Sequence, residues 1–186
     1  MRRDKLANRR PIFPIIHIIG LPGSGKTTLA AQLSRKLGLP TFRIGAYRSK
    51  FPLSPIGEAD AWVALFKDLS RRKWSNCILE TTGLNQRESF LGMAFPLSQM
   101  VTIKLDAPQK LLYARIGKKR KKEQGGEWLF SADYPDKYKF VGKLYKKFKK
   151  LPADIEIDTT RLTPGRVYHA ALLKLEPYEI FGSRQG

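Results

Sequence analysis

Short apolar runs alternate with stretches of helical periodicity along most of this chain. The first apolar run, residues 12–19, is almost continuously hydrophobic, as in a strand that is buried on both faces of a sheet. His17 lies inside this run and is therefore expected to be a hydrogen-bonded core residue. Apolar positions at helical spacing follow over residues 27–37, and Gly38 then ends the predicted helix.

The same alternation continues down the chain and predicts its fold class. Another helix is expected after the fourth strand, with Asp106 as its N-cap and Pro108 in its first turn. Five strands separated by helices predict an α/β three-layer sandwich, in which a five-stranded parallel sheet is covered by helices on both faces. The remaining strands are predicted at 41–44, 76–80, 100–105 and 155–158, and the remaining helices at 59–74, 88–95, 136–150 and 164–175.

One domain is predicted, preceded by a short basic arm. Residues 1–11 are rich in Arg and Lys, so we expect a flexible segment there. Residues 12–186 are expected to share one core, for which a hydrophobic content of 42% suffices. No apolar run approaches the roughly 18 residues of a membrane span. The lone cysteine, Cys77, has no internal disulfide partner, which favours a reducing cytoplasm.

The segment between the first strand and the first helix carries the strongest chemical signal. Gly20, four further residues, and then Gly25, Lys26 and Thr27 fit the phosphate-binding Walker A loop. Its glycines allow backbone N–H groups to point at a polyphosphate, and the helix that follows adds its positive dipole end. Lys26 would reach the outer phosphates, and the Thr27 hydroxyl would ligate Mg²⁺. We therefore predict ATP and Mg²⁺ binding through Gly20, Pro22, Gly23, Ser24, Gly25, Lys26, Thr27 and Thr28.

Charged residues also follow the second and third predicted strands. The carboxyl ends of parallel strands meet at one edge of a sheet, where ligands bind. Glu80 is expected either to hold a Mg²⁺-bound water or take a proton from an attacking hydroxyl, or merely to cap its turn. Arg48 is expected to bind a phosphate or carboxylate of the acceptor with both arms of its guanidinium. The alternative for Arg48 is a surface position in a basic protein.

The net charge of +19, with an isoelectric point near 10.2, exceeds what a nucleotide site needs. An anionic polymer or a large anionic substrate would explain the excess, and so would a generally basic surface. Much of it lies between Lys110 and Lys150, where fourteen Lys and Arg accompany four acids. In this stretch Arg115 and Arg120 are expected to fold over the triphosphate and offset transition-state charge, or else to form a solvated face.

Together these features resemble the small P-loop kinases, a superfamily that includes adenylate, shikimate and gluconate kinases and polynucleotide 5′-kinases. Residues 20–28 match the shared phosphate loop, and residues 45–48 look like the acceptor-binding turn that ends in arginine. Residues 44–48 and 80–87 taken together are most similar to phosphofructo-2-kinase and its relatives. The resemblance implies a P-loop nucleoside triphosphate hydrolase fold.

The resemblance extends into the second half of the chain. Residues 111–115, followed by Arg120, are similar to the helix that enters a mobile lid, which implies a basic helical lid at about 115–135. Residues 158–164 look like the loop that packs on adenine, which implies a nucleotide contact at Thr160. The N-terminal arm has no counterpart in this resemblance.

One departure concerns the acceptor. Polynucleotide and shikimate kinases place an aspartate after the second strand as general base, whereas this chain has Gly45 and Ala46 there. Either Glu80 substitutes for it, or the acceptor is a phosphate that needs no base.

The function predicted from the sequence is an ATP- and Mg²⁺-dependent kinase that transfers the γ-phosphoryl group to a nucleotide or a nucleic-acid end. Two alternatives stay open. One is a small-metabolite kinase that acts on a sugar, a sugar phosphate or a shikimate-like compound. The other is a nucleic-acid-binding ATPase without an acceptor, in which Tyr134, Tyr138 and Tyr145 would stack on bases. An anionic partner and no membrane partner are expected, and the oligomeric state is left open.

Overall fold

The computed structural model describes residues 14–84, 100–122 and 136–178, with the backbone alone at 119–122. The predicted arm at 1–11, the predicted helix at 88–95 and most of the predicted lid lie outside the described residues. Residues 115–122 of that lid form the second half of a helix. No helix in the described ranges is long and apolar enough to span a bilayer.

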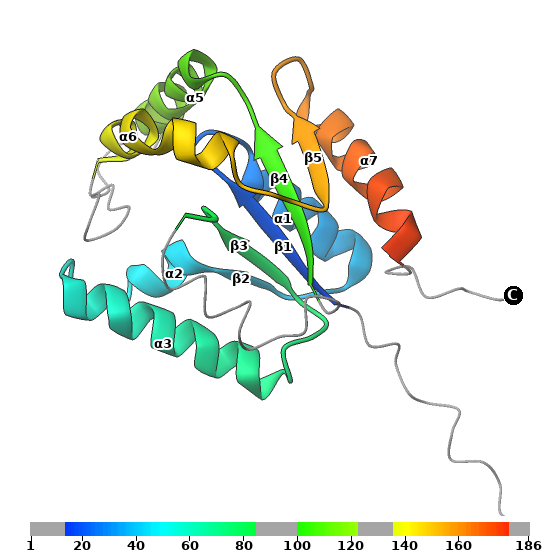
Figure 1. Cartoon of the computed structure of the whole chain (residues 1–186). Helices are drawn as coiled ribbons and strands as arrows, with labels where there is room; N and C mark the ends of the chain where they lie inside the picture. The colour runs from blue at the N-terminus through cyan, green and yellow to red at the C-terminus, as the bar shows by residue number, and fades with distance from the viewer. Residues whose placement is uncertain (1–13, 85–99, 123–135, 179–186) are drawn as a thin grey trace, which may run out of the picture.

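Five parallel strands form the sheet, as predicted (Figure 1). Their order is β2-β3-β1-β4-β5, which places the first strand at the centre. All six residues of β1 are buried, because helices cover both faces and neighbours pair with both edges. The strands are β1 (Ile15–Gly20), β2 (Thr41–Arg43), β3 (Ile78–Thr81), β4 (Met100–Asp106) and β5 (Ile155–Asp158).

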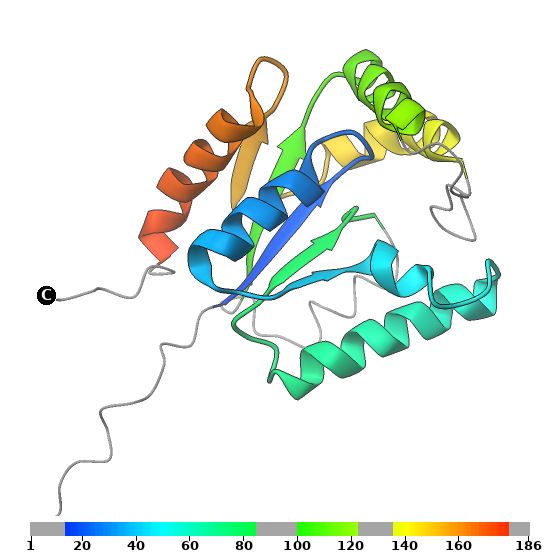
Figure 2. The same cartoon turned by 180° about the vertical axis from the view of Figure 1, so that it is seen from behind.

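Helices on both faces complete the predicted three-layer sandwich. The helices α1 and α7 cover one face (Figure 2), while α3 and the C-terminal part of α6 cover the other. The helix α5 packs beside α6 beyond the carboxyl ends of the strands (Figure 1). The helices are α1 (Lys26–Leu37), α2 (Ile44–Arg48), α3 (Pro55–Arg71), α5 (Gln109–Lys122), α6 (Lys137–Lys149) and α7 (Pro164–Leu175), followed by the 3₁₀ turn η3 (Glu176–Tyr178).

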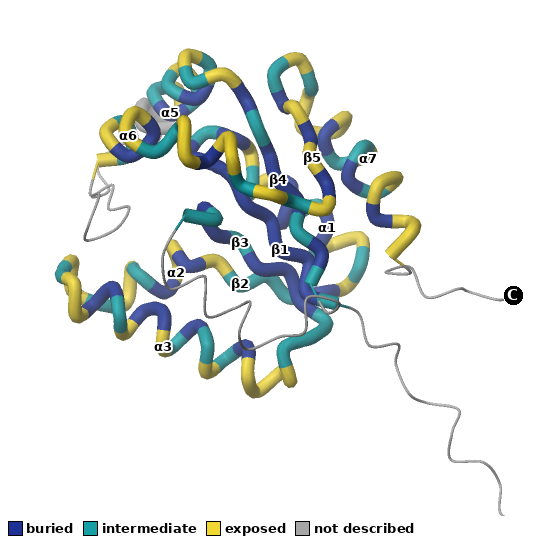
Figure 3. Tube along the Cα trace, viewed as in Figure 1, coloured by how far each residue is buried: buried dark blue, intermediate teal, exposed yellow. Residues whose placement is uncertain are grey.

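Three apolar clusters form the core between the helices and the sheet, and the buried positions lie on the inner sides of the helices (Figure 3). Between the sheet and α3, Trp62 and Leu65 pack on the strands. Phe140 and Phe148 of α6 join residues of α5 in a third cluster that reaches Leu21, next to the first strand. The helices at the carboxyl edge are therefore packed directly against the segment that leaves β1.

The helix α3 begins at Pro55, four residues before the predicted start at 59. The Ser54 side chain accepts a hydrogen bond from the Gly57 N–H at 3.0 Å and caps the helix, and Pro55 occupies the first turn. Ser followed by Pro is a typical helix start, because proline lacks an N–H where the helix has no acceptor for it. Residues 45–48, predicted as a turn, belong to the short helix α2, and Ile44, predicted as the end of the second strand, is the first residue of that helix.

The prediction that Asp106 caps a helix is wrong. Asp106 is the last residue of β4, pairs in register with Asp158 of β5, and forms an ion pair with Lys149. The helix α5 begins instead at Gln109. The carbonyl of Pro108, directly before it, accepts hydrogen bonds from the N–H groups of Leu111 and Leu112. Sheet pairing thus extends one residue further than the apolar pattern does.

Replacing Gly57 with alanine should destabilise the protein. A methyl group at this position would collide with the backbone carbonyl oxygen of Pro52, which cannot move without opening the start of α3. We expect the free energy of unfolding of Gly57→Ala to fall by roughly 1–3 kcal/mol in chemical denaturation. Gly165→Ala is the matched control, because it also lies early in a helix but has nothing within 4 Å of the added carbon. The control should gain about 0.5–1 kcal/mol, and equal stabilities of the two variants would contradict the clash.

Candidate functional site

The predicted phosphate loop connects β1 to α1 at the carboxyl edge of the sheet. Gly23 and Gly25 adopt the left-handed backbone region, with φ of 84° and 98°. Gly23 is also closely packed, because a side chain there would approach the backbone oxygen of Leu112 to 2.8 Å. Only glycine satisfies both conditions, so the spacing of glycines in the sequence is explained by the turn itself.

Lys26 and Thr27 are the first two residues of α1, where the positive end of the helix dipole lies. The Lys26 ammonium donates a hydrogen bond to the Leu21 carbonyl at 3.2 Å, which folds the side chain back over the loop. The Thr27 hydroxyl donates to the Glu80 Oε1 atom at 2.8 Å. The structure thus brings together the phosphate loop and the acid at the end of β3, which lie far apart in the sequence.

The second oxygen of this carboxylate is the observation that tests for Mg²⁺. Glu80 Oε2 is buried and has no hydrogen-bond partner in the described part of the chain. A buried carboxylate oxygen normally has a partner, and Mg²⁺ takes oxygen ligands from one or two protein groups together with substrate phosphates. Thr27 and Glu80 therefore fit the ion, with the Thr27 hydroxyl already aligned on the same carboxylate.

A cavity of about 440 Å³ joins the phosphate loop to the ends of β2 and β3. Glu80 is the only acid among the described residues that line it, and cations enter it from four separate helices, α1, α2, α5 and α6. Its polar and charged lining includes Lys26, Thr27, Thr28, Arg48, Glu80, Thr81, Thr82, Arg115 and Lys137. The cavity is therefore suited to two anionic groups placed side by side.

The predicted acceptor residue Arg48 is held by a buried acid that the sequence analysis missed. Arg48 donates from Nε and Nη2 to the two carboxylate oxygens of Glu58, at 2.8 and 2.6 Å. Glu58 is only 3% exposed, and its Oε1 also accepts a hydrogen bond from the Trp62 indole at 2.9 Å. This bidentate pairing fixes the plane of the guanidinium against α3 and thereby sets the position of the Arg48 side chain at the cavity wall.

A signal for Glu58 does exist in the sequence. The apolar stripe of α3 runs through Trp62, Leu65 and Leu69, and one step of four residues back from Trp62 leads to Glu58. An acid on the buried side of a helix needs a cationic partner, and Arg48 and Lys50 are the cations of the preceding segment. Lys137 and Thr159 were also missed: Lys137 belongs to no recognisable motif, whereas Thr159 lies within residues 158–164, where Thr160 was named instead.

Arg115 lies between this cavity and a second one of about 210 Å³. It donates to the hydroxyl and to the backbone carbonyl of Thr159, at 2.9 and 2.7 Å. The second cavity has an apolar wall of Leu29, Leu162, Pro164 and Val167, and it shares Gly23, Gly25 and Thr28 with the first. The phosphate loop thus has an apolar pocket on one side and a cationic pocket on the other.

Of the remaining predicted site residues, Thr160 lies away from both cavities and Arg120 has a side chain outside the described residues. Thr160 lines neither cavity, because its N–H and hydroxyl both bond to Asp158 Oδ1, and these hydrogen bonds lower the pKa of Asp158. Thr159 lines the second cavity in its place. The backbone of Arg120 belongs to α5, and its side chain lies outside the described residues.

His17 supports the strand end that carries Glu80. Its Nε2 atom lies 2.8 Å from the Thr81 hydroxyl oxygen, which also accepts a bond from the Gly83 N–H. Burial lowers the pKa of His17 to about 4, so the ring is neutral at ordinary pH. The prediction of a hydrogen-bonded core histidine is confirmed.

Comparison with known proteins identifies the same fold. The sequence model of the family described as AAA domain matches residues 15–128. A sugar kinase from Janibacter sp. HTCC2649 has a TM-score of 0.62 at 20% identity, over 88% of this chain and 95% of that one. A gluconokinase from Sinorhizobium meliloti 1021 has a TM-score of 0.63 at 15% identity, over 90% and 94%. A shikimate kinase from Acinetobacter baumannii gives 0.60 at 19%, over 89% and 93%. The predicted small P-loop kinase fold is confirmed.

A curated shikimate kinase from Paracidovorax citrulli (strain AAC00-1) is also similar in sequence. The identity is 68%, but it extends over 25 residues, which are 13% of this chain and 14% of that protein. A match of this length supports a shared local motif and carries no information about the acceptor.

The buried His17 predicts a specific loss of stability in acid. Its pKa is lower in the folded chain than the ordinary 6.5, so the unfolded chain takes up the proton first as the pH falls. The resulting stability is complete above pH 6.5 and is lost between pH 6.5 and 4. Between pH 7 and 4, the wild type should lose about 3 kcal/mol more free energy of unfolding than His17→Gln. The matched control is His169→Gln, which removes an exposed histidine and should follow the wild type; parallel curves for all three proteins would refute this role.

Proposed function

Because this chain belongs to the AAA domain family, we propose that it is an ATP- and Mg²⁺-dependent kinase whose acceptor is a small anionic metabolite. One observation carries the proposal: a single cavity extends from the phosphate loop to Arg48, which the buried Glu58 holds in place. A nucleotide-binding loop alone is compatible with simple hydrolysis. A second cationic position in the same cavity supports a second, anionic substrate.

We assign the nucleotide to the phosphate loop and the apolar second cavity. The triphosphate lies against the loop backbone and Lys26, and the base enters between Leu162, Pro164 and Val167. Arg115, between the two cavities, is placed to offset the charge of the transferred group. Thr160 stays a prediction for nucleotide contact, and so does Arg120.

Thr27 and Glu80 are the residues that we assign to Mg²⁺. The buried, unpartnered Oε2 atom of Glu80 and the adjoining Thr27 hydroxyl support this assignment. When bound, the ion neutralises charge on the β- and γ-phosphates. The chain itself keeps the two oxygens together through the parallel pairing of β1 with β3.

The acceptor end of the cavity favours an anion over a neutral sugar. Neutral hydroxyl groups are bound best by carboxylate and amide side chains that accept hydrogen bonds. Among the described lining residues, Glu80 alone is of this kind, whereas Arg48 and Lys137 both carry positive charge. A carboxylate or phosphate group on the acceptor matches these two side chains.

The size of the cavity separates the sequence-based alternatives. A volume of about 440 Å³ is in the range of small-molecule sites. It favours a small-metabolite kinase, one of the two alternatives left open by the sequence, over the first prediction of a kinase that acts on a nucleic-acid end. The likeness in fold to sugar, gluconate and shikimate kinases points the same way.

The transfer step follows from these assignments. An acceptor oxygen forms a bond to the γ-phosphorus while the bond to the β–γ bridging oxygen breaks, so ADP leaves. A hydroxyl acceptor must also lose a proton, and Glu80 is the only carboxylate that lines the cavity in the described chain. A phosphate acceptor releases no such proton, in which case Glu80 serves the metal alone.

The proposal predicts acceptor-dependent ADP formation. We expect ADP release to rise with a carboxylated or phosphorylated polyol, to stay low with the matching neutral sugar, and to fall roughly 100- to 1000-fold in Lys26→Ala. A coupled assay for ADP, with mass detection of the phosphorylated product, measures this over a panel of hydroxy acids, sugar phosphates, neutral sugars and a 5′-hydroxyl oligonucleotide. If only the oligonucleotide were phosphorylated, the acceptor would be a nucleic-acid end and not a small metabolite. If no acceptor stimulated ADP release, the protein would not be a kinase.

Arg48 should control the acceptor and not ATP. Arg48→Lys keeps the positive charge beside Glu58 but loses the planar fork that fixes the guanidinium. We expect the KM for the acceptor to rise roughly 10- to 100-fold while the KM for ATP stays within about twofold. Arg43→Lys is the matched control, because Arg43 is exposed at the end of β2 and lines neither cavity. A change in the KM for ATP of the same size would reassign Arg48 to the nucleotide.

A further inference from the structure

The outward face of α6 carries a group of lysines that line neither cavity. These side chains repeat every three or four residues and span about 16 Å of helix. All of them are exposed, whereas Phe140, Val141 and Phe148 on the opposite side are buried. The lysine face consists of Lys139, Lys143, Lys146, Lys147, Lys149 and Lys150, the last being the C-cap.

This face conflicts with helix stability. Three pairs of lysines lie four residues apart, namely 139 with 143, 143 with 147, and 146 with 150, and like charges at that spacing repel. The thirteen residues of α6 include no acid. Lys149, at the end of the face, forms an ion pair with Asp106 of β4. A local feature that opposes folding is expected where a binding function requires it.

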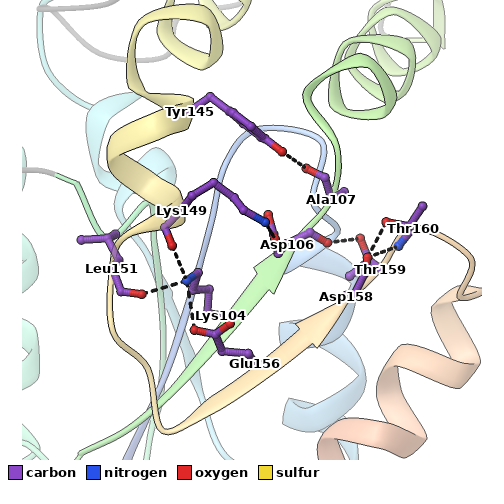
Figure 4. A network of polar contacts seen from close by, with 10 residues as sticks. All are labelled: Lys104, Asp106, Ala107, Tyr145, Lys149, Leu151, Glu156, Asp158, Thr159 and Thr160. Carbon is purple, nitrogen blue, oxygen red and sulfur yellow. Dashed lines mark hydrogen bonds and ion pairs between the residues drawn. The ribbon is translucent and has the colours of Figure 1, made fainter.

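The helix holds its lysine face in a fixed position. Lys104 of β4 is 3% exposed and donates to the backbone oxygens of Lys149 and Leu151, at 3.1 and 2.8 Å (Figure 4). Its third hydrogen bond, at 3.0 Å, goes to Glu156 of β5. A buried ammonium thus binds the C-terminal carbonyls of α6 to the sheet, and the lysine face is preformed.

We propose that the lysine face of α6 binds the phosphate backbone of duplex DNA. A row of lysines without acids complements a polyanion, and a DNA duplex carries one charge per about 1.7 Å of its axis. Sequence-independent contacts to phosphates need only such cations. The bound DNA is not the phosphoryl acceptor, so this inference goes beyond the proposed function and does not depend on it.

The other polyanionic partners fit the face less well. Proteins bind single strands with aromatic side chains on which the bases stack. Here the ring of Tyr138 packs against that of Tyr113, with 5.6 Å between the ring centroids, and the Tyr145 hydroxyl donates a hydrogen bond to the Ala107 carbonyl at 3.4 Å. Both tyrosines are thus engaged within the protein. A basic patch alone gives only weak, reversible attachment to an anionic membrane, and the inserted apolar side chains that would strengthen it are lacking here, because the apolar side of α6 is buried against the rest of the protein.

The test measures binding of a fluorescent 20-base-pair DNA duplex by anisotropy, with the full chain, between 50 and 200 mM salt. The variant removes four exposed charges together: Lys139→Gln, Lys146→Gln, Lys147→Gln and Lys150→Gln. Lys149 is left intact because it pairs with Asp106. If these lysines contact phosphates, the slope of log affinity against log salt falls by about 3 to 4, and affinity at the lowest salt falls on the order of 100-fold. The matched control removes four exposed cations elsewhere: Arg35→Gln, Lys36→Gln, Lys67→Gln and Arg72→Gln.

The outcomes separate the proposal from its alternatives. The proposal is supported if only the α6 variant loses DNA affinity and shows a smaller dependence of affinity on salt. Equal losses in both quadruple variants would contradict it, because binding would then reflect the overall charge of the protein. A single-stranded oligonucleotide or anionic phosphatidylserine vesicles that bind more tightly than the duplex would overturn the choice of partner. The melting temperature of the α6 variant should not fall, since repulsion is removed. If the melting temperature does fall, the corresponding Lys→Arg variant is measured, because it keeps the positive charges. The proposal requires that this variant still binds the duplex, and loss of binding would contradict it.

Discussion

The parallel pairing of β1 with β3 is the interaction on which the site depends. It aligns Ile18 with Glu80 and Ile19 with Thr81, so the acid at the end of β3 comes level with the exit of β1. Two residues further the chain enters the phosphate loop, and Thr27 in the first turn of α1 reaches back to Glu80. A slip of one residue in this register would turn Glu80 to the opposite face of the sheet, because side chains alternate along a strand. The buried, isoleucine-rich β1 prevents that slip, since its own two faces must both stay covered.

A second constraint fixes the acceptor end. Burying the carboxylate of Glu58 is unfavourable unless charge and hydrogen bonds compensate for it, and here Arg48 and the Trp62 indole together supply three hydrogen bonds. The pair is therefore costly to break and holds the guanidinium without help from a substrate. Arg48 is the last residue of α2, whose short length leaves it dependent on α3 for support. The start of α3 at Ser54 and Pro55 is thus part of the site as well as of the fold.

Hydrophobic periodicity was sufficient to predict the parallel sheet, its five strands and the helices that cover it. The phosphate loop was equally accessible, because the geometry of the turn by itself requires glycine at Gly23 and Gly25, although Gly23 is in addition packed against Leu112 of α5. Asp106 was predicted wrongly, since a local capping preference competes with strand pairing that only the folded sheet reveals. Glu58 was missed although its spacing from Trp62 on α3 places it on the buried side of the helix. Lys137 and Thr159 were missed because their roles arise from contacts across the chain, as between Arg115 and Thr159, which no local spacing records.

The net charge of +19 is best understood as several populations of cations with different partners. Lys104, Arg48 and Arg115 are tied to acceptors inside the protein, and their charge serves the packing of α6, α3 and the loop after β5. Lys26 and Lys137 line the main cavity, where the triphosphate and an anionic acceptor would meet. The lysine face of α6 differs from both groups, because its side chains are exposed, repel one another and stand on a helix that the buried Lys104 holds to the sheet. A surface that was basic only for solubility would not need to gather its charge on one anchored helix face, whereas a surface that meets an extended polyanion would.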